Sequence, residues 1–133
     1  MQEIWDLIRQ NQSIQFSWGR TLSVGAVEAI VERLLPDEHV RAAFYGEEAG
    51  VLKVFAYTNY RTIIGSEERL LFRKQKFVEV IDTRNPRASG LCPDRKPTCF
   101  QWEGRTVNFP PVDWRKNGEI FRQLEKLYYD YNY

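Results

Sequence analysis

The stretch that decides the fold is VLKVFAYTNYRTIIGSEERLLFRKQKFVEVI, residues 51–81. Apolar residues, many of them β-branched or aromatic, run from Val51 to Tyr57, recur in a short segment from Arg61 to Ile64 and resume from Leu70 to Ile81, as is typical of strands. Asn59 and the segment 65–68 carry residues that favour turns, so they are predicted to separate the strands. Because no helix lies between these strands, the pattern favours an antiparallel meander over the catalytic α/β folds.

The residues before this stretch predict two helices and a hairpin. A short amphipathic helix is predicted over residues 3–10. A second helix is predicted from residue 24 to about residue 34, with Ser23 as its N-cap, because its apolar residues recur at helical spacing. A strand over residues 40–45 and a hairpin loop over residues 46–50 then lead into the central stretch.

The residues after it predict a loop, two strands and a closing helix. Residues 82–97 contain three prolines and are expected to form one long loop, followed by strands at 98–102 and 105–109. A broad apolar stripe predicts a helix over residues 113–131. The predicted fold is α+β: a strongly curved antiparallel sheet or small barrel with an N-terminal amphipathic helix and a C-terminal capping helix, in a single domain over residues 1–133.

Composition places the chain among ordinary globular proteins. Hydrophobic residues make up 43% and charged residues 28% of its 133 residues, so one domain can bury a core. No apolar run approaches the roughly 20 residues that a spanning helix needs. The start, MQEIWDLIRQ, lacks a basic region followed by an apolar one, which is the order found in secretory signals. These features predict a soluble cytoplasmic protein without a transmembrane segment.

The chain carries no recognisable catalytic motif. It has no GxSxG, no GxxxxGK[ST] and no HExxH, and its single histidine, His39, is expected at a surface position at the start of a strand. The acidic pairs at 47–48 and 67–68 fall in predicted turns, where they would serve solubility. The sequence therefore predicts a protein that is not an enzyme and uses no cofactor.

Cys92 and Cys99 are the two cysteines of the chain. A structural zinc site needs four ligands, and the sequence offers no second pair of ligands near them, so we expect no bound metal. The interpretation we favour is two free thiols. A disulfide across the loop and a regulatory thiol pair favoured by Arg95 and Lys96 remain as alternatives.

Positive charge is concentrated in the middle of the chain. Residues 69–118 hold 11 basic and 5 acidic side chains, whereas residues 1–68 hold 6 and 10. Arg69, Arg73, Lys74 and Lys76, beside Phe72 and Phe77, are predicted to share one strand, and such a surface can bind phosphates or stack bases. A solvated edge strand protected by lysines explains the same residues. The candidate binding residues of this basic region are Arg73, Lys74, Lys76, Arg84, Arg87, Arg95 and Lys96.

The C-terminal residues are rich in tyrosine. Tyr129 and Tyr133 lie off the apolar stripe of the predicted helix, so they are free to face a partner. Exposed tyrosines supply contact area at a small entropic cost, which suits an interface. Packing against the sheet is the competing interpretation.

LLPDEHVRAAFYG (residues 34–46), together with the strands that follow, resembles bacterial pleckstrin-homology-like domains. Such domains often have a leucine and a glutamate ahead of the first strand, matched here by Leu35 and Glu38, and a Thr-x-x-Arg segment, matched by Thr58 and Arg61. The resemblance covers residues 23–131. The long 82–97 loop and the presence of only about six predicted strands depart from the family's pattern.

This resemblance implies a seven-stranded barrel plugged by the C-terminal helix. It also implies a non-enzymatic scaffold that binds proteins or lipid headgroups through loops at the open end, and it carries over no binding residue.

Two functions follow from the sequence as hypotheses. The first is a non-enzymatic protein-interaction module, such as an adaptor, inhibitor or assembly factor, whose partner is another protein. The alternative is binding of an anionic ligand, nucleic acid or a lipid headgroup on a membrane surface, through the basic 69–96 region. Salt separates the two, because phosphate contacts release counterions and weaken steeply as salt rises.

Overall fold

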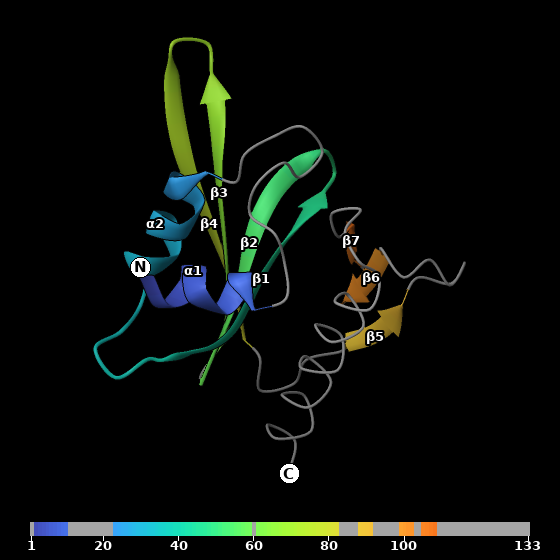
Figure 1. Cartoon of the computed structure of the whole chain (residues 1–133). Coiled ribbons are helices and arrows are strands. Elements are labelled where there is room, and N and C mark those ends of the chain that lie inside the picture. Colours follow the sequence, from blue (N-terminus) through green and yellow to red (C-terminus); the bar gives the residue numbers. More distant parts are fainter. Residues whose placement is uncertain are drawn as a thin grey trace.

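The computed structural model describes residues 2–10, 23–59, 61–82, 88–91, 99–102 and 105–108 (Figure 1). These residues form two helices and seven strands. Their order along the chain is α1 (Gln2–Arg9), α2 (Val24–Val31), β1 (Val40–Glu48), β2 (Val51–Thr58), β3 (Arg61–Leu70), β4 (Arg73–Asp82), β5 (Ala88–Leu91), β6 (Cys99–Trp102) and β7 (Arg105–Asn108). The predicted C-terminal helix, residues 113–131, lies outside the described residues.

The strands form one antiparallel sheet in the order β4-β3-β2-β1-β7-β6-β5. Strands β1 to β4 make a continuous meander, and β7 joins it through the pairing of Glu47 with Asn108. Within the described residues, β4 and β5 are the two edges and do not pair with each other, so the sheet is open rather than a closed barrel. The predicted α+β class and the antiparallel sheet are confirmed.

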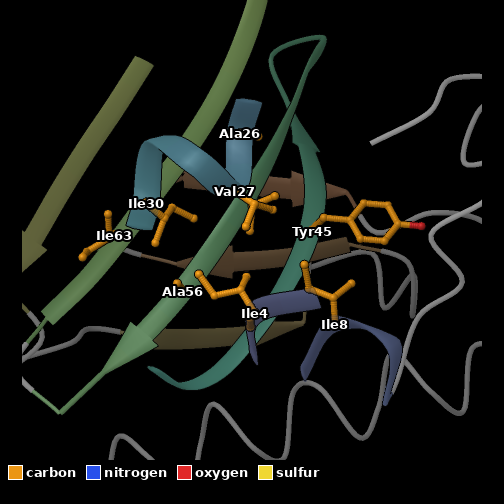
Figure 2. Close-up of a cluster of buried hydrophobic side chains, with 10 residues drawn as sticks. Ile4, Ile8, Ala26, Val27, Ile30, Tyr45, Ala56 and Ile63 are labelled. Atoms are coloured by element: carbon orange, nitrogen blue, oxygen red, sulfur yellow. The ribbon is translucent and has the colours of Figure 1, made fainter. Parts of the chain in front are cut away.

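Both described helices cover the same face of the sheet. Helix α1 contacts β1, and α2 packs mainly against β3 and β4. Figure 2 shows the buried side chains of the two helices and of the sheet that form this core. The fully or nearly fully buried members of this core are Ile4, Ile8, Ala26, Val27, Ile30, Ala43, Tyr45, Val54, Ala56 and Ile63.

The opposite face of the sheet is also apolar. Phe44 and Phe55 are cross-strand partners with stacked rings 5.0 Å apart, and the ring of Tyr57 lies 6.3 Å from that of Phe44. All three side chains are buried, on the face that α1 and α2 do not cover. Apolar residues on both faces explain why the strand sequences carry few exposed polar positions near their centres.

Helix α2 begins where the sequence predicts. Ser23 has an extended backbone and its Oγ accepts a hydrogen bond of 3.1 Å from the Gly25 amide, which is the geometry of an N-cap. The regular helix ends at Val31, a few residues earlier than predicted, and the chain continues through a turn at residues 32–33.

The predicted turn at residues 65–68 is wrong, because β3 continues through it as far as Leu70. Gly65 marks a close approach and not a turn. A Cβ at this position would lie 2.1 Å from the Ala26 carbonyl oxygen and 2.9 Å from Ile30 Cγ1. Helix α2 therefore rests directly on the backbone of β3, and only glycine leaves room for it.

The predicted loop at residues 46–50 is also shorter than expected. Strand β1 continues to Glu48, so the connection to β2 consists of Ala49 and Gly50 alone. Both have positive φ, 52° and 81°, as a type I′ turn requires.

The loop predicted over residues 82–97 is interrupted by β5, so the expectation of one continuous loop is wrong. The sequence Ala-Ser-Gly-Leu has neither β-branched nor aromatic residues, and it gives no strand signal of its own. These residues form a strand because they pair with β6. Strand β5 is therefore the strand that the sequence-based prediction missed.

Candidate interaction surface

The β3–β4 hairpin is the longest ladder of the sheet and forms a projecting arm. Ten residue pairs join its strands, from Arg61 opposite Asp82 to Leu70 opposite Arg73. Figure 1 shows the arm extending past both helices and past the β1–β2 hairpin. Leu71 and Phe72 form the connection at the end of this arm.

The end of the arm is apolar and exposed. Leu71 retains 91% and Phe72 100% of its accessible surface, and Leu70 retains 39%. Leu71 also has a φ of 42°, in the left-handed region that favours glycine. Neither burial nor backbone geometry accounts for a leucine at this position.

Three cations surround these apolar residues. Direct cross-strand partners share a face of a sheet, so Arg69 and Lys74 lie on the α2 side of the arm, while Arg73 and its partner Leu70 lie on the other side. All three cations are exposed, and none forms an ion pair in the described part of the chain. We call Leu71, Phe72 and these three cations the hairpin tip.

The structure corrects the predicted arrangement of the basic cluster. Arg69 and Arg73 do not share one strand, since Arg69 is the second-last residue of β3 and Arg73 is the first residue of β4. Phe72 lies in the turn between them. The turn had no glycine, proline or asparagine to reveal it, so the sequence pattern read as one strand from Leu70 onward.

Lys76 has a different environment from the other cations. Its Nζ lies 2.6 Å from Oε1 of Glu32, the C-cap of α2, and 3.6 Å from Oε2 of Glu28 within α2. The hydrogen bond to Glu32 raises the pKa of Lys76 above its ordinary value. Lys76 thus ties the arm to α2 and is already paired, which leaves it out of the hairpin tip.

Glu67 forms a second contact between the arm and α2. It lies opposite Lys76 in β3, and its Oε1 accepts a hydrogen bond from Ser23 Oγ. The carboxylate therefore sits at the N-terminus of α2, where a negative charge is favoured by the helix dipole. This placement corrects the expectation that Glu67 and Glu68 lie at a hairpin turn.

A polar groove runs from this contact toward the hairpin tip. It has a volume of about 540 Å³. Its lining residues are Ser23, Val24, Gly25, Glu28, Glu67, Arg69 and Lys74. Arg69 and Lys74 face the groove beside the two carboxylates, so the groove is of mixed charge, and the cationic surface is concentrated at the tip.

Glu38 and Arg61 form a buried ion pair at the opposite end of the arm. Arg61 donates to Glu38 from Nε and from Nη2, each over 2.9 Å, and Thr58 Oγ1 donates over 2.6 Å. The Leu35 amide adds a fourth hydrogen bond of 3.1 Å. Burial alone would raise the pKa of Glu38, but the hydrogen bonds from Arg61, Thr58 and Leu35 outweigh it and lower that pKa. The cluster is saturated with partners, which fits a structural role.

His39 lies next to this cluster but takes part only through its backbone. Its amide donates to Asn59 Oδ1 over 2.9 Å, and its carbonyl accepts from the Asn59 amide over 3.2 Å. The side chain is exposed, as predicted. Among the described residues, no three His, Cys, Asp or Glu side chains gather in a way that could hold a metal ion.

Other candidate residues from the sequence lie outside the described residues. These are Arg84, Arg87, Arg95, Lys96, Tyr129 and Tyr133, together with Cys92. Cys99 belongs to β6, but its side chain is not described. No described helix has the length and apolar character needed to cross a membrane.

Leu71 is the surface residue that sequence reasoning missed, and Phe72 was named only as a neighbour of the basic cluster on a strand, not as part of an exposed turn. The signal that could have identified them is the run from Arg69 to Val78, which holds four basic residues and no acidic one around three consecutive apolar residues.

Comparison with known proteins gives no match: no family model, curated protein or solved structure matches this chain.

Proposed function

We propose that this protein is a non-enzymatic interaction module that attaches to its partner through the hairpin tip. The observation that carries the proposal is the near-complete exposure of Leu71 and Phe72 at the end of a paired arm. Large apolar side chains held in solvent at an outermost point gain free energy only when a partner covers them.

The way in which the arm is attached supports the same proposal. Lys76 and Glu67 tie the arm to α2 part-way along its length, and the ten-pair ladder between β3 and β4 fixes its direction. A contact surface presented on a fixed support loses little conformational entropy when it binds. A contact surface of this kind suits an adaptor, an inhibitor or an assembly factor.

Binding of an anionic ligand is the second candidate function. It is favoured by Arg69, Arg73 and Lys74, which have no ion-pair partner among the described residues. The basic residues that the sequence places in the 82–97 region lie outside the described residues, so this candidate rests on the three cations of the tip.

The experiment uses the full chain in its own cell lysate, with membrane fragments retained, and measures sedimentation on a gradient. We expect the parent chain to sediment within a larger assembly and Leu71→Ser/Phe72→Ser to sediment as the free chain. The matched control is Val24→Ser/Leu35→Ser, which also removes two exposed apolar side chains, 52% and 49% exposed, but outside the arm.

The control variant should sediment with the parent. If the parent already sediments as the free chain, or if the tip variant and the control variant lose the assembly equally, the hairpin tip is not the contact surface and the proposal fails.

A further inference from the structure

We propose that the hairpin tip binds the surface of an anionic lipid bilayer, with Leu71 and Phe72 entering the interface and the cations contacting headgroups. This inference rests on the proposed function, because it names the partner of the same surface. Its four supports are the shape of the tip, the placement of its charges, the absence of carboxylates from residues 69–78 and the reach of the arm.

The shape of the tip favours a bilayer over a protein pocket. Leu71 and Phe72 form the end of a two-stranded arm, and their side chains are almost completely exposed. A bilayer accepts such a protrusion without a preformed cavity, whereas a protein partner needs a pocket that surrounds both residues. Side chains of this kind, apolar with basic neighbours, are those that bind at a membrane interface.

The charges are placed on both faces of the arm. Arg69 and Lys74 flank the apolar residues on the α2 side, and Arg73 flanks them on the opposite side. A partner that docks against one face would meet only part of this set. A headgroup layer that the tip enters from above meets all three cations, because they lie in the last two pairs of the β3–β4 ladder.

The last residues of the arm carry no carboxylate, and the nearest ones along the strands, Glu67 and Glu68, precede Arg69. From Arg69 to Val78 the sequence holds four basic side chains and no carboxylate, so nothing in this run repels an anionic surface. Basic residues next to an anionic leaflet are attracted within a Debye length, which would also orient the tip toward the surface before contact.

The arm is long enough for the tip to reach a flat surface. Lys76, which pairs with Glu32 and Glu28, is the residue of the arm nearest the tip that forms an ion pair with the α2 region among the described residues. Since a strand rises about 3.4 Å per residue, Phe72 lies roughly 14 Å beyond this point along the arm. The tip can therefore enter an interface while α2 stays in water.

The experiment measures co-sedimentation of the full chain with two kinds of vesicle, one of phosphatidylcholine alone and one of phosphatidylcholine mixed with phosphatidylserine. We expect binding to the mixed vesicles and little binding to the neutral ones. Leu71→Ser/Phe72→Ser should weaken the partition by about tenfold or more at low and high salt. Arg69→Gln/Arg73→Gln should weaken it by about fivefold for each charge removed, and only at low salt.

Two matched controls show whether the effects belong to the tip. Val24→Ser/Leu35→Ser removes the same number of apolar side chains, and Arg9→Gln/Arg33→Gln the same number of arginines, outside the arm. Both should bind mixed vesicles like the parent. Absence of parent binding to mixed vesicles overturns the inference, and so does binding that the tip variants leave unchanged.

A further measurement replaces the vesicles with single-stranded DNA. Binding to DNA that is as strong as binding to vesicles, and indifferent to Leu71→Ser/Phe72→Ser, would assign the cations to a nucleic acid and overturn the inference. Failure here is distinct from failure of the proposed function. A parent chain that ignores vesicles but still sediments in a tip-dependent assembly has a protein as its partner.

Discussion

Arg61 binds Glu38 through two parallel hydrogen bonds, from Nε to Oε2 and from Nη2 to Oε1, each 2.9 Å long. The Glu38 side chain is completely buried, and 24% of the Arg61 side chain is exposed. Arg61 Nη2 also donates to the Arg33 carbonyl over 2.7 Å. One guanidinium thus joins the start of β3 to the chain between α2 and β1, and it holds the base of the arm.

Replacing Glu38 tests this pair. Glu38→Gln removes the negative charge and leaves Arg61 partly buried without a counter-ion. The free energy of unfolding should therefore fall by about 2–4 kcal/mol at neutral pH. The control is Glu3→Gln, an exposed carboxylate on α1, which should cost little. Urea unfolding of both variants and the parent measures the difference.

The same pair predicts a dependence on pH. The folded state lowers the pKa of Glu38, so the pair's contribution to stability is fully present above the unfolded pKa of the carboxyl and is lost as the pH falls through the folded value. The stability gap between parent and Glu38→Gln should therefore narrow below about pH 4. A gap that stays constant down to low pH would contradict this assignment.

Gly65→Ala tests the packing of α2 on β3. The added Cβ would meet the Ala26 carbonyl oxygen, which belongs to the helix backbone and cannot turn aside. We expect α2 to shift and the free energy of unfolding to fall by about 1–3 kcal/mol or more. Thermal melts measure this, and an unchanged melting temperature would show that α2 does not rest on β3 as described.

Ala49→Asn should stabilise the β1–β2 hairpin. Ala49 has a φ of 52° in a two-residue turn with Gly50, and Asn-Gly is the preferred sequence of such turns. Relief of the left-handed strain should add up to about 1 kcal/mol. Chemical denaturation checks the sign, and a loss of stability would mean that the turn has another geometry.

Leu124→Ala tests the C-terminal helix predicted from sequence. Phe44, Phe55 and Tyr57 are buried on a face that α1 and α2 leave uncovered, and the apolar stripe through Leu124 is the surface that the sequence offers for it. Loss of a buried leucine should cost about 2–5 kcal/mol. A melting temperature equal to that of the parent would show that this helix does not pack against the core.

The sequence predicted the elements whose signals are local. Ser23 caps α2 through its own side chain, and the alternating residues of β1 and β2 form strands, so both follow from short-range pattern. Gly65 misled the prediction, because a glycine that admits a helix against a strand looks the same in sequence as a glycine in a turn. Only the packing of residues distant in sequence distinguishes a glycine at a helix–strand contact from a glycine in a turn.

The hairpin tip could not be predicted for a related reason. The turn at Leu71 and Phe72 uses residues that ordinarily extend a strand, and the register of β3 against β4 sets its position. Pairing of Glu67 with Lys76, and of both with α2, fixes that register across residues distant in sequence. The charge of the basic region was visible in sequence, whereas its division between two faces of an arm was not.

The most direct test of the central claim is Leu71→Gly, measured for both stability and vesicle binding. Glycine suits the φ of 42° at this position and removes an exposed apolar side chain. If Leu71 serves contact and not folding, the variant should be as stable as the parent, or more stable by up to about 1 kcal/mol, and should bind mixed vesicles more weakly. A variant that loses stability while keeping the parent's binding would contradict the account.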